Sequence, residues 1–335
     1  MTTSDNATSI KVTKFSGFAV TASLVGGLFF ATGAQAAPSV SDARLDAWTT
    51  AIAKTPVPSE GCFTASYPDT AWTKTACVTV PLRPFIPTHG VHGWTGTTGD
   101  GNDYAAVTST LTSSGVGSFP VVTGLKTETD EGHANDYSLQ LNSNFMSSDP
   151  ACAGAANPQN CLGWEQFVYS SGEDAAFMQY WLITYGPKCP AGWNSFSGDC
   201  YKNSNAVGVP LQVIKQLKNL KLSGSAVANG IDTLILTTKK GKAYSTTGQD
   251  SVVYLADGWT ASEFNVIGDG GGSEAVFNAG TSLTVQIDLT DGSTNAPTCQ
   301  AHDGTTGETN NLDLGSCTAS GGQTPSVSFT DSLPK

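Results

Sequence analysis

The chain has 335 residues, of which 39% are hydrophobic and only 13% are charged. Lysine and arginine number 16 against 28 aspartates and glutamates, so the formal net charge is −12 at pH 7. This acidic balance argues against a nucleic-acid-binding protein, because contact with a phosphate backbone needs a basic surface. The hydrophobic content predicts a packed core, and a composition rich in Gly, Thr and Ser favours β-structure over helix.

Residues 1–36 have the pattern of a secretory signal peptide. Lys11 and Lys14 provide a basic start, residues 18–31 are mostly apolar, and residues 34–36 read Ala-Gln-Ala, the small-x-small pattern that precedes a cleavage site. No other stretch approaches the roughly 18 consecutive apolar residues of a membrane span. We therefore predict a monomer secreted to an extracellular or periplasmic space, beginning at Ala37 and free of the membrane after cleavage.

Residues 37–117 are predicted to form an N-terminal appendage, a propeptide or a linker. A short amphipathic helix is expected over 41–54, with Leu45, Trp48 and Ile52 on one side. Prolines at 81, 84 and 87 indicate an extended stretch, and residues 88–118 are rich in Gly, Thr and Ser.

Eight cysteines fall into four close pairs along the sequence. In a secreted protein an even number indicates disulfides, although eight cysteines allow 105 connectivities. None of the pairs has the two-residue gap of a zinc knuckle, so we predict neither a metal site nor a cofactor. We expect pairing between neighbours: Cys62 with Cys77, Cys152 with Cys161, Cys189 with Cys200, and Cys299 with Cys317.

Residues 118–335 show the period-two alternation of strands that have one buried face. Between 137 and 145 the apolar side chains fall on odd positions, whereas the even positions are Ser or amides. Further strands are expected at 163–169, 176–185, 232–238, 251–256, 259–267 and 283–289, and a helix at 210–220. This spacing predicts an all-β fold, a two-sheet antiparallel β-sandwich of jelly-roll or concanavalin-like type. The residues expected to point inward are Leu139, Leu141, Phe264, Val266, Leu283, Val285 and Ile287.

The sequence contains no Gly-x-Ser-x-Gly elbow, no His-Glu-x-x-His pair and no P-loop. Carboxyl and amide groups on strands therefore remain as the candidates for catalysis. Glu263 is expected on a half-covered sheet beside Trp259, where desolvation would raise its pKa and suit it to acid-base chemistry. Gln179 would stabilise an oxyanion if its strand neighbours that of Glu263. The ordinary alternative is that these side chains belong to the solvent-facing side of a sandwich.

Two short segments resemble the glutamic peptidases. Residues 261–266, Ala-Ser-Glu-Phe-Asn-Val, resemble the Ala-Glu-Trp-Ile-Val-Glu stretch of that family, and residues 178–181, Met-Gln-Tyr-Trp, resemble its glutamine-bearing strand. The departures are an inserted Ser262, Phe264 in place of Trp, and Gly268 or Asp269 where a second Glu is expected. The resemblance implies two bent antiparallel sheets, acid-acting endopeptidase activity and a removed propeptide, with Glu263 as the base and Gln179 as the oxyanion partner.

Two other functions fit the same sandwich. A glycan-binding or surface-interaction module without catalysis would use aromatic rings and amides as a sugar platform. A polysaccharide hydrolase would use Glu165 and Glu263 as paired carboxyls. The expected partner is accordingly a polypeptide or polysaccharide substrate. The residues assigned to substrate binding are Trp164, Gln166, Trp181, Trp259 and Asn265.

Overall fold

The computed structural model describes residues 40–88 and 96–335. The predicted signal peptide, with its cleavage site after Ala36, lies outside the described residues. Every element below belongs to the unit Val40–Lys335. Within the described ranges, no helix is long and apolar enough to cross a membrane.

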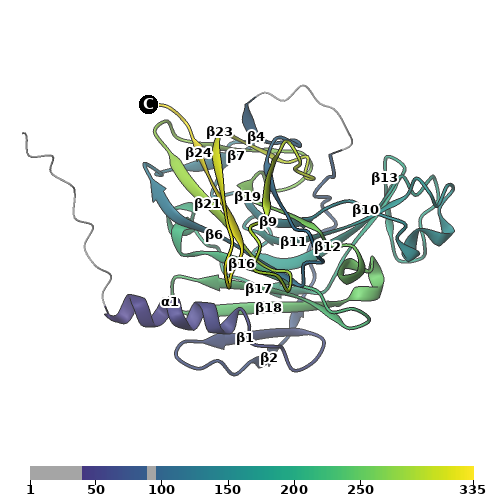
Figure 1. Ribbon diagram of the computed structural model, residues 1–335, viewed down its shortest axis with the longest axis horizontal. Helices are drawn as coiled ribbons and strands as arrows, with labels where there is room; N and C mark the ends of the chain where they lie inside the picture. The colour runs from purple at the N-terminus through teal and green to yellow at the C-terminus, as the bar shows by residue number, and fades with distance from the viewer. Residues whose placement is uncertain (1–39, 89–95) are drawn as a thin grey trace, which may run out of the picture. The chain divides into compact units, whose positions relative to one another are not determined.

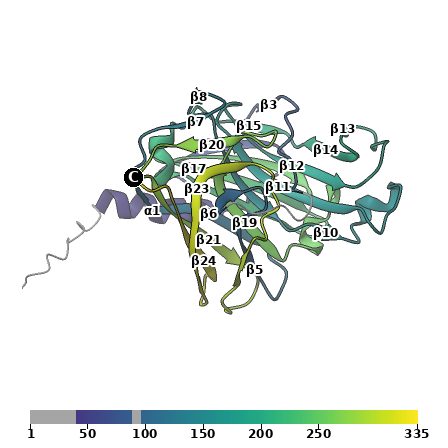
Figure 2. The same cartoon turned by 90° about the horizontal axis from the view of Figure 1, so that it is seen from above.

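Strands form two large sheets, here called sheet A and sheet B (Figures 1 and 2). In the described residues sheet A has 13 strands: in spatial order β2 (Thr73–Thr75), β1 (Cys62–Ser66), β18 (Lys242–Gln249), β17 (Ile231–Thr238), β16 (Lys221–Ser225), β6 (Ser114–Thr123), β21 (Ser282–Thr290), β24 (Ser326–Ser332), β23 (Thr309–Ser320), β20 (Glu274–Phe277), β7 (Glu128–Asp130) and β8 (His133–Ala134), with β4 (Thr97–Gly99) paired to β23.

Sheet B has 11 strands in the same described part of the chain. Their spatial order is β13 (Asn194–Phe196), β14 (Asp199–Asn203), β12 (Ala175–Ile183), β11 (Leu162–Ser170), β9 (Ser138–Ser143), β19 (Ala261–Ile267), β5 (Tyr104–Val107) and β22 (Thr298–Ala301), with β10 (Met146–Ser147) on β11, and β15 (Ala206–Gly208) joining β12 to β3 (Cys77–Val78). These pairings are antiparallel, whereas β20 and β23 of sheet A run parallel. The predicted all-β antiparallel sandwich is therefore confirmed.

The core between the sheets follows the predicted alternation. All seven side chains expected to point inward are buried in one hydrophobic cluster. Phe119 of sheet A and Phe264 of sheet B meet there with ring centroids 5.2 Å apart. A Cβ atom at Gly117 would lie 2.1 Å from the Phe264 ring, so glycine is what lets the sheets approach this closely.

Helical segments are few and short. The expected helix at 41–54 is α1 (Val40–Ile52), whose Trp48 and Ile52 pack on Ile235 and Ala243, on the side of sheet A facing away from sheet B. The other helices among the described residues are 3₁₀ segments: η1 (Pro150–Gly154), η2 (Ile214–Asn219), η3 (Asp250–Val252) and η4 (Leu255–Asp257).

Two sequence-based predictions of elements were wrong. Residues 251–256 are not a strand: they lie in η3 and η4, where the buried Asp250 Oδ1 accepts a hydrogen bond from the Ala256 backbone N–H. In the predicted helix at 210–220, only Ile214–Asn219 is helical, as the 3₁₀ segment η2. Its apolar positions Ile214 and Leu217 are three residues apart, a spacing that a 3₁₀ turn also places on one side.

Four disulfides join the cysteines as expected: Cys62–Cys77, Cys152–Cys161, Cys189–Cys200 and Cys299–Cys317. Each closes a loop of between 9 and 18 residues in sequence separation. The Cys299–Cys317 bond has a further role, because it connects β22 of sheet B to β23 of sheet A.

The segment predicted as an appendage, residues 37–117, contributes strands to both sheets. β1 and β2 are the two outermost strands at one end of sheet A, and within the described part of the chain β3 pairs only with β15. In contrast, β5 lies inside sheet B between β19 and β22. Removal of this segment as a propeptide stays a prediction.

Candidate functional site

Sheet B carries a row of polar side chains on the face opposite the one whose Leu139, Leu141 and Phe264 belong to the main hydrophobic cluster. Cross-strand pairing aligns Glu263 with Asn142, Asn142 with Gln166, and Gln166 with Gln179, across the four strands β19, β9, β11 and β12. Gln140 lies on the same side of β9, two residues from Asn142. We call these five side chains the polar row: Gln140, Asn142, Gln166, Gln179 and Glu263.

Hydrogen bonds connect the polar row along its length. Asn142 Nδ2 donates to Glu263 Oε2 at 3.1 Å and to Gln140 Oε1 at 3.3 Å, and Gln166 Nε2 donates to the same Gln140 oxygen at 3.0 Å. Trp181 Nε1 then donates to both Gln166 Oε1 and Gln179 Oε1, at 3.2 and 3.0 Å. Because these groups are buried, the network fixes their orientation before any ligand arrives.

Glu263 differs from the other members in how its two oxygens are used. Oε2 accepts from Asn142, from Thr305 Oγ1 and from the backbone N–H groups of Thr305 and Thr306, at 2.7 to 3.2 Å. Oε1 is buried and has no hydrogen-bond partner within the described residues. Burial raises the pKa of Glu263 above its ordinary value, and the hydrogen bonds from Thr305 and Asn142 oppose part of that rise.

Two further carboxyl groups lie close to Glu263. Asn265 Nδ2, two residues along β19, donates to Asp103 Oδ2 and to Asp331 Oδ2, each at 3.0 Å. Burial raises the pKa of Asp103, and the charges of Glu263 and Asp331 raise it further. Burial also raises the pKa of Asp331, to about 7. The site therefore contains several carboxyl groups that stay protonated at a higher pH than an ordinary carboxyl group does.

Two segments far apart in the sequence cover the polar row, namely residues 81–88 and residues 304–308. They pair with each other through a bridge between Pro87 and Thr306 and a hydrogen bond from Gly307 N to the Ile86 carbonyl. A Cβ atom at Gly304 would lie 2.7 Å from Glu263 Oε1, so the second segment comes this close only because residue 304 is glycine. The covering explains why these polar side chains, expected on a solvent-facing sheet, are buried.

Glu263 and Gln179 are not brought together. Two strands, β9 and β11, separate them, which corresponds to about 14 Å between their backbones at a strand spacing of about 4.8 Å. Gln179 instead bonds the backbone of the covering segment: its Oε1 accepts from Phe85 N at 2.7 Å and its Nε2 donates to the Arg83 carbonyl at 3.0 Å. The amide next to Glu263 belongs to Asn142.

The three tryptophans assigned to substrate binding divide between the two faces of sheet B. Trp164 and Trp181 lie on the same face as the polar row, and both are fully buried. Trp181 stacks on Tyr201 with a centroid distance of 5.0 Å. Trp259 was placed wrongly: it lies in the core between the sheets, against Phe167, because it precedes β19 and does not follow its alternation.

Glu165 and Glu263 lie on opposite faces of sheet B, which excludes them as a facing pair of carboxyls. On β11 the side chain of Glu165 alternates with Trp164 and Gln166, so it points toward sheet A. There it lies near Asp232, and burial, followed by the charge of Asp232, raises the pKa of Glu165. The polysaccharide hydrolase that requires this pair is therefore not supported.

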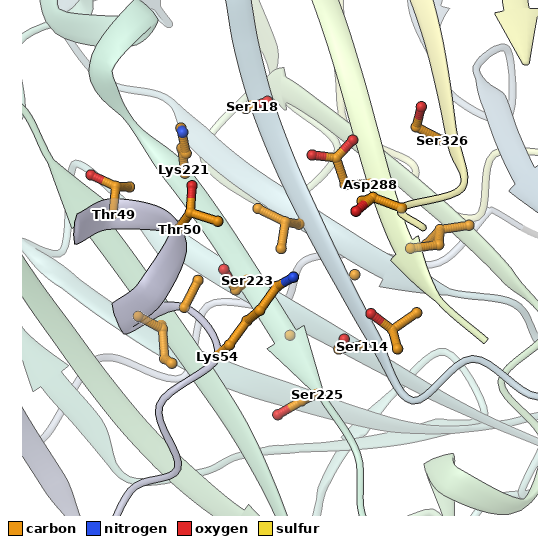
Figure 3. A pocket seen from close by; sticks show the side chains of 18 of the residues that line it. Thr49, Thr50, Lys54, Ser114, Ser118, Lys221, Ser223, Ser225, Asp288 and Ser326 are labelled. Carbon is orange, nitrogen blue, oxygen red and sulfur yellow. The ribbon is translucent and has the colours of Figure 1, made fainter. Parts of the chain in front are cut away.

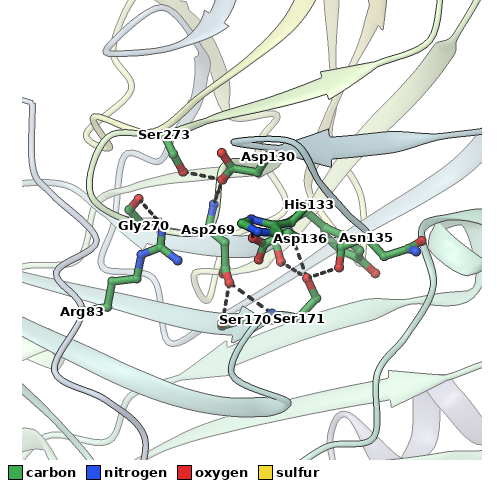
Figure 4. Close-up of polar contacts among 12 residues, drawn as sticks. Arg83, Asp130, His133, Asn135, Asp136, Ser170, Ser171, Asp269, Gly270 and Ser273 are labelled. Carbon is green, nitrogen blue, oxygen red and sulfur yellow. Dashed lines mark hydrogen bonds and ion pairs between the residues drawn. The ribbon is translucent and has the colours of Figure 1, made fainter.

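A second group of carboxyl groups, Asp130, Asp136 and Asp269, lies near Arg83, at the start of the covering segment 81–88 (Figure 4). Asp269 accepts from Ser170 Oγ at 2.9 Å and from Gly172 N at 3.1 Å, and its own N–H donates to Asp130 at 2.7 Å. Burial, together with the charge of Asp136, raises the pKa of Asp269 to about 8. Across residues 40–88 and 96–335, no group of three or more His, Cys, Asp and Glu side chains is arranged to hold a metal ion.

A cavity of about 350 Å³ lies between α1 and the outer face of sheet A (Figure 3). Its wall on the α1 side includes Thr49, Thr50 and Lys54, and the strands contribute Lys221 and Asp288 together with several serines and threonines. None of the residues assigned to catalysis or substrate binding lines it. It is separate from the polar row, which belongs to sheet B.

Sequence reasoning missed the residues that complete the surroundings of Glu263: Asp103, Thr305, Thr306, Glu308 and Asp331. For one of them, Asp331, the sequence contains a pattern that could have identified it. Residues 326–332 alternate, with Val327, Phe329 and Asp331 on the buried side, so a carboxyl occupies a core position of a strand. A charge in such a position is a candidate functional group.

Comparisons with known proteins give structural neighbours alone. No family model matches the sequence, and no curated protein matches it. One similar solved structure is scytalido-glutamic peptidase with a transition-state analogue inhibitor, at a TM-score of 0.29 and 12% identity, covering 70% of this chain and 97% of that chain. Another is SCP-B, a member of the eqolisin family in complex with the tripeptide Ala-Ile-His, at a TM-score of 0.29 and 12% identity, covering 68% and 96%.

Proposed function

We propose that the chain is a secreted, acid-acting peptide hydrolase in which Glu263 is the general base. The observation that carries the proposal is the environment of this carboxyl group. One of its oxygens is held by several hydrogen bonds, and the other is buried and unpaired. A carboxyl group held in this way is oriented for proton transfer at its free oxygen.

The proposed step is attack of a water molecule on a peptide carbonyl, with Glu263 Oε1 taking the proton of that water. The carbonyl oxygen then becomes an oxyanion, which needs a hydrogen-bond donor close by. Asn142 takes the place first given to Gln179, because it is the amide beside Glu263. Its two N–H groups donate to Glu263 Oε2 and Gln140 Oε1, so one of them must leave Gln140 to bond the oxyanion. Collapse of the oxyanion to a carbonyl then breaks the C–N bond, and the protonated Glu263 gives its proton to the leaving amine nitrogen.

The raised pKa values at the site set the pH range of the proposed action. A base with a raised pKa becomes active only above the ordinary glutamate value of about 4.3. Asp103 and Asp331 remain protonated over part of the same range, because their pKa values are raised as well. We expect a bell-shaped dependence of kcat/KM on pH with its maximum on the acid side of neutrality.

The test is to incubate the secreted protein with denatured casein between pH 2 and 7 and to compare it with Glu263→Gln. This substitution keeps the shape of the side chain and removes its titration, so proteolysis should disappear at every pH while the melting temperature stays nearly constant. Glu128→Gln is the matched control, because Glu128 is also a buried carboxyl with a raised pKa but lies on β7, outside the polar row. It should retain activity.

Cleavage of nothing by the wild type, or full activity in Glu263→Gln, would overturn the proposal. Binding of the protein to immobilised polysaccharide, lost in Trp181→Ala, would then favour the glycan-binding module. The burial of the Trp164 and Trp181 rings counts against that module, because a sugar needs an open aromatic face.

Secretion is part of the same proposal. Four disulfides support it, since such bonds persist mainly in oxidising compartments. Mass spectrometry of exported material should find Ala37 at the N-terminus, and an intact Met1 would contradict the assignment.

A further inference from the structure

The first covering segment, Pro81–Thr88, lies across sheet B as an extended peptide. Its three prolines, at positions 81, 84 and 87, fix φ near the values of an extended chain and so restrict the conformations that the segment can adopt. It joins neither sheet as a strand, and apart from the single bridge at Pro87 it has no ladder partner. What holds the segment is therefore a set of individual contacts.

Those contacts bond the backbone of almost every residue from Leu82 to Thr88. The side chain of Gln179 bonds Arg83 and Phe85 as a neighbouring strand would, with one donor and one acceptor. The remaining bonds run from Tyr201 Oη to the Leu82 carbonyl, Gly271 N to the Pro84 carbonyl, Ile86 N to Glu308 Oε1, Gly307 N to the Ile86 carbonyl, and Thr88 N to the Thr305 carbonyl, at 2.7 to 2.9 Å. Bonds to backbone groups bind an extended chain whatever its side chains are.

One side chain of the segment enters a pocket. Phe85 is fully buried, with its ring centroid 5.9 Å from that of Phe177. Val168 and Ala175 of sheet B, together with Ala206 and the preceding Val80, complete this apolar cluster. The pocket lies directly beside Gln179, because Phe177 and Gln179 are two residues apart on the same face of β12. An apolar anchor next to a backbone clamp is the usual form of a side-chain subsite for an extended peptide.

The strands and the helix that precede this segment lie at the margins of the fold, although Cys62 and Val80 also contribute to buried clusters. β1 and β2 are the two outermost strands at one end of sheet A, β3 pairs with β15 alone among the described strands, and α1 covers an outer face. The Cys62–Cys77 disulfide lies wholly within residues 40–88. Withdrawal of Val40–Thr88 would therefore open no central strand and break no disulfide to the rest of the protein.

We propose that sheet B holds a subsite for a bulky apolar residue of an extended polypeptide, formed by the Val168, Ala175 and Phe177 pocket and the Gln179 clamp, and that Phe85 fills it in cis. The tether gives Pro81–Thr88 a high effective concentration at the subsite, so it competes with any peptide supplied from solution. The substrate class, polypeptides with a bulky apolar residue at this subsite, rests on the proposed function. Binding of the peptide does not require catalysis.

The test measures binding of a fluorescein-labelled octapeptide, Pro-Leu-Arg-Pro-Phe-Ile-Pro-Thr, by fluorescence anisotropy. The full secreted chain carries Glu263→Gln throughout, so that the probe is not cut. Phe85→Ala removes the competing anchor. The apparent affinity for the probe should then be about 30-fold higher than that of the chain that keeps Phe85, because a buried anchor residue has an effect of this size. A probe with Ala in place of its Phe should lose the same factor.

Leu82→Ala is the matched control, because the Leu82 side chain is 55% exposed and only its carbonyl is bound. It should behave as the unaltered chain does. If thermal unfolding shows that Phe85→Ala fails to fold, Phe85→Leu takes its place. This variant keeps an apolar side chain in the pocket, so its affinity for the probe should lie between that of the chain with Phe85 and that expected for Phe85→Ala.

Equal binding by all variants, or no binding by folded Phe85→Ala and Phe85→Leu, would overturn the inference. Binding as expected, together with no cleavage by a Phe85→Ala chain that retains Glu263, would keep the subsite and remove the proposed function. Proteolysis by the wild type, without any effect of Phe85 substitutions on peptide binding, would keep the proposed function and remove the subsite.

Discussion

Leu141 and Asn142 are neighbours on β9 that point to opposite faces of sheet B, and the sequence predicts a core role for one and an exposed role for the other. Leu141 is indeed in the core. Asn142 is equally buried, because residues 304–308 lie over it and it bonds Glu263. Alternation reveals which face a residue is on, but it does not reveal whether a distant segment covers that face.

Leu141→Ala should lower the free energy of unfolding by about 2–5 kcal/mol, because it leaves a cavity between the sheets. Urea unfolding measures the change. Leu111→Ala is the control, since its side chain is 49% exposed and surface truncations usually stay within about 0.5 kcal/mol. Equal losses in the two variants would mean that the register of β9 is wrong.

Thr305→Val should raise the pKa of Glu263 further. The Thr305 hydroxyl donates to Glu263 Oε2 at 3.0 Å and favours the charged carboxylate, so its loss favours the protonated form. The ascending limb of the kcat/KM profile should therefore move to higher pH. Thr237→Val is the matched control: that threonine is also buried, and its hydroxyl has no hydrogen-bond partner in the described chain, so the profile should not move.

At the scale of elements, the strands with strong alternation could be predicted and the weakly patterned segments could not. The expected strands at 163–169, 176–185 and 259–267 correspond to β11, β12 and β19. Residues 251–256 include β-branched and aromatic residues, as strands do, but they form no strand because the chain turns there through two 3₁₀ segments. Strand order could not be predicted either, and it is the order that separates Gln179 from Glu263.

The disulfide between β22 and β23 should contribute measurably to stability, since it links the two sheets. Replacing Cys299 and Cys317 together by Ser should lower the free energy of unfolding by about 3 kcal/mol, the loop-closure value for this separation. Chemical unfolding without reductant is the measurement. An unchanged midpoint would show that the bond adds nothing to the packing between the sheets.

At the scale of the whole molecule, the local pairing of cysteines could be predicted, because it depends only on near neighbours in the sequence and on an oxidising compartment. The site could be predicted only in part. Glu263 was identifiable from its strand, but its surroundings come from residues around 103, 305 and 331, which no local pattern connects to it. Long-range covering of a sheet depends on tertiary packing, which single-sequence reasoning does not supply.

The same burial predicts an unusual dependence of stability on pH. Burial is the largest cause that raises the pKa of Glu128, Asp232 and Asp269 to about 8, and of Asp149 and Asp331 to about 7. In the unfolded chain the same groups titrate near 4. Between about pH 4 and pH 8 the folded state therefore binds more protons than the unfolded state, so stability rises as the pH falls through this window.

The melting temperature should accordingly be higher at pH 4 than at pH 8, in buffers of equal ionic strength. The contribution of these carboxyls is fully present below the unfolded pKa and is lost as the pH rises through the folded values. Asp232→Asn removes one of the raised groups and should flatten the dependence, whereas Asp46→Asn, at an exposed position on α1, should leave it unchanged. A melting temperature that increases from pH 4 to pH 8 would mean that these carboxyls are ionised in the folded protein, and the acid-side maximum expected for catalysis would lose its basis as well.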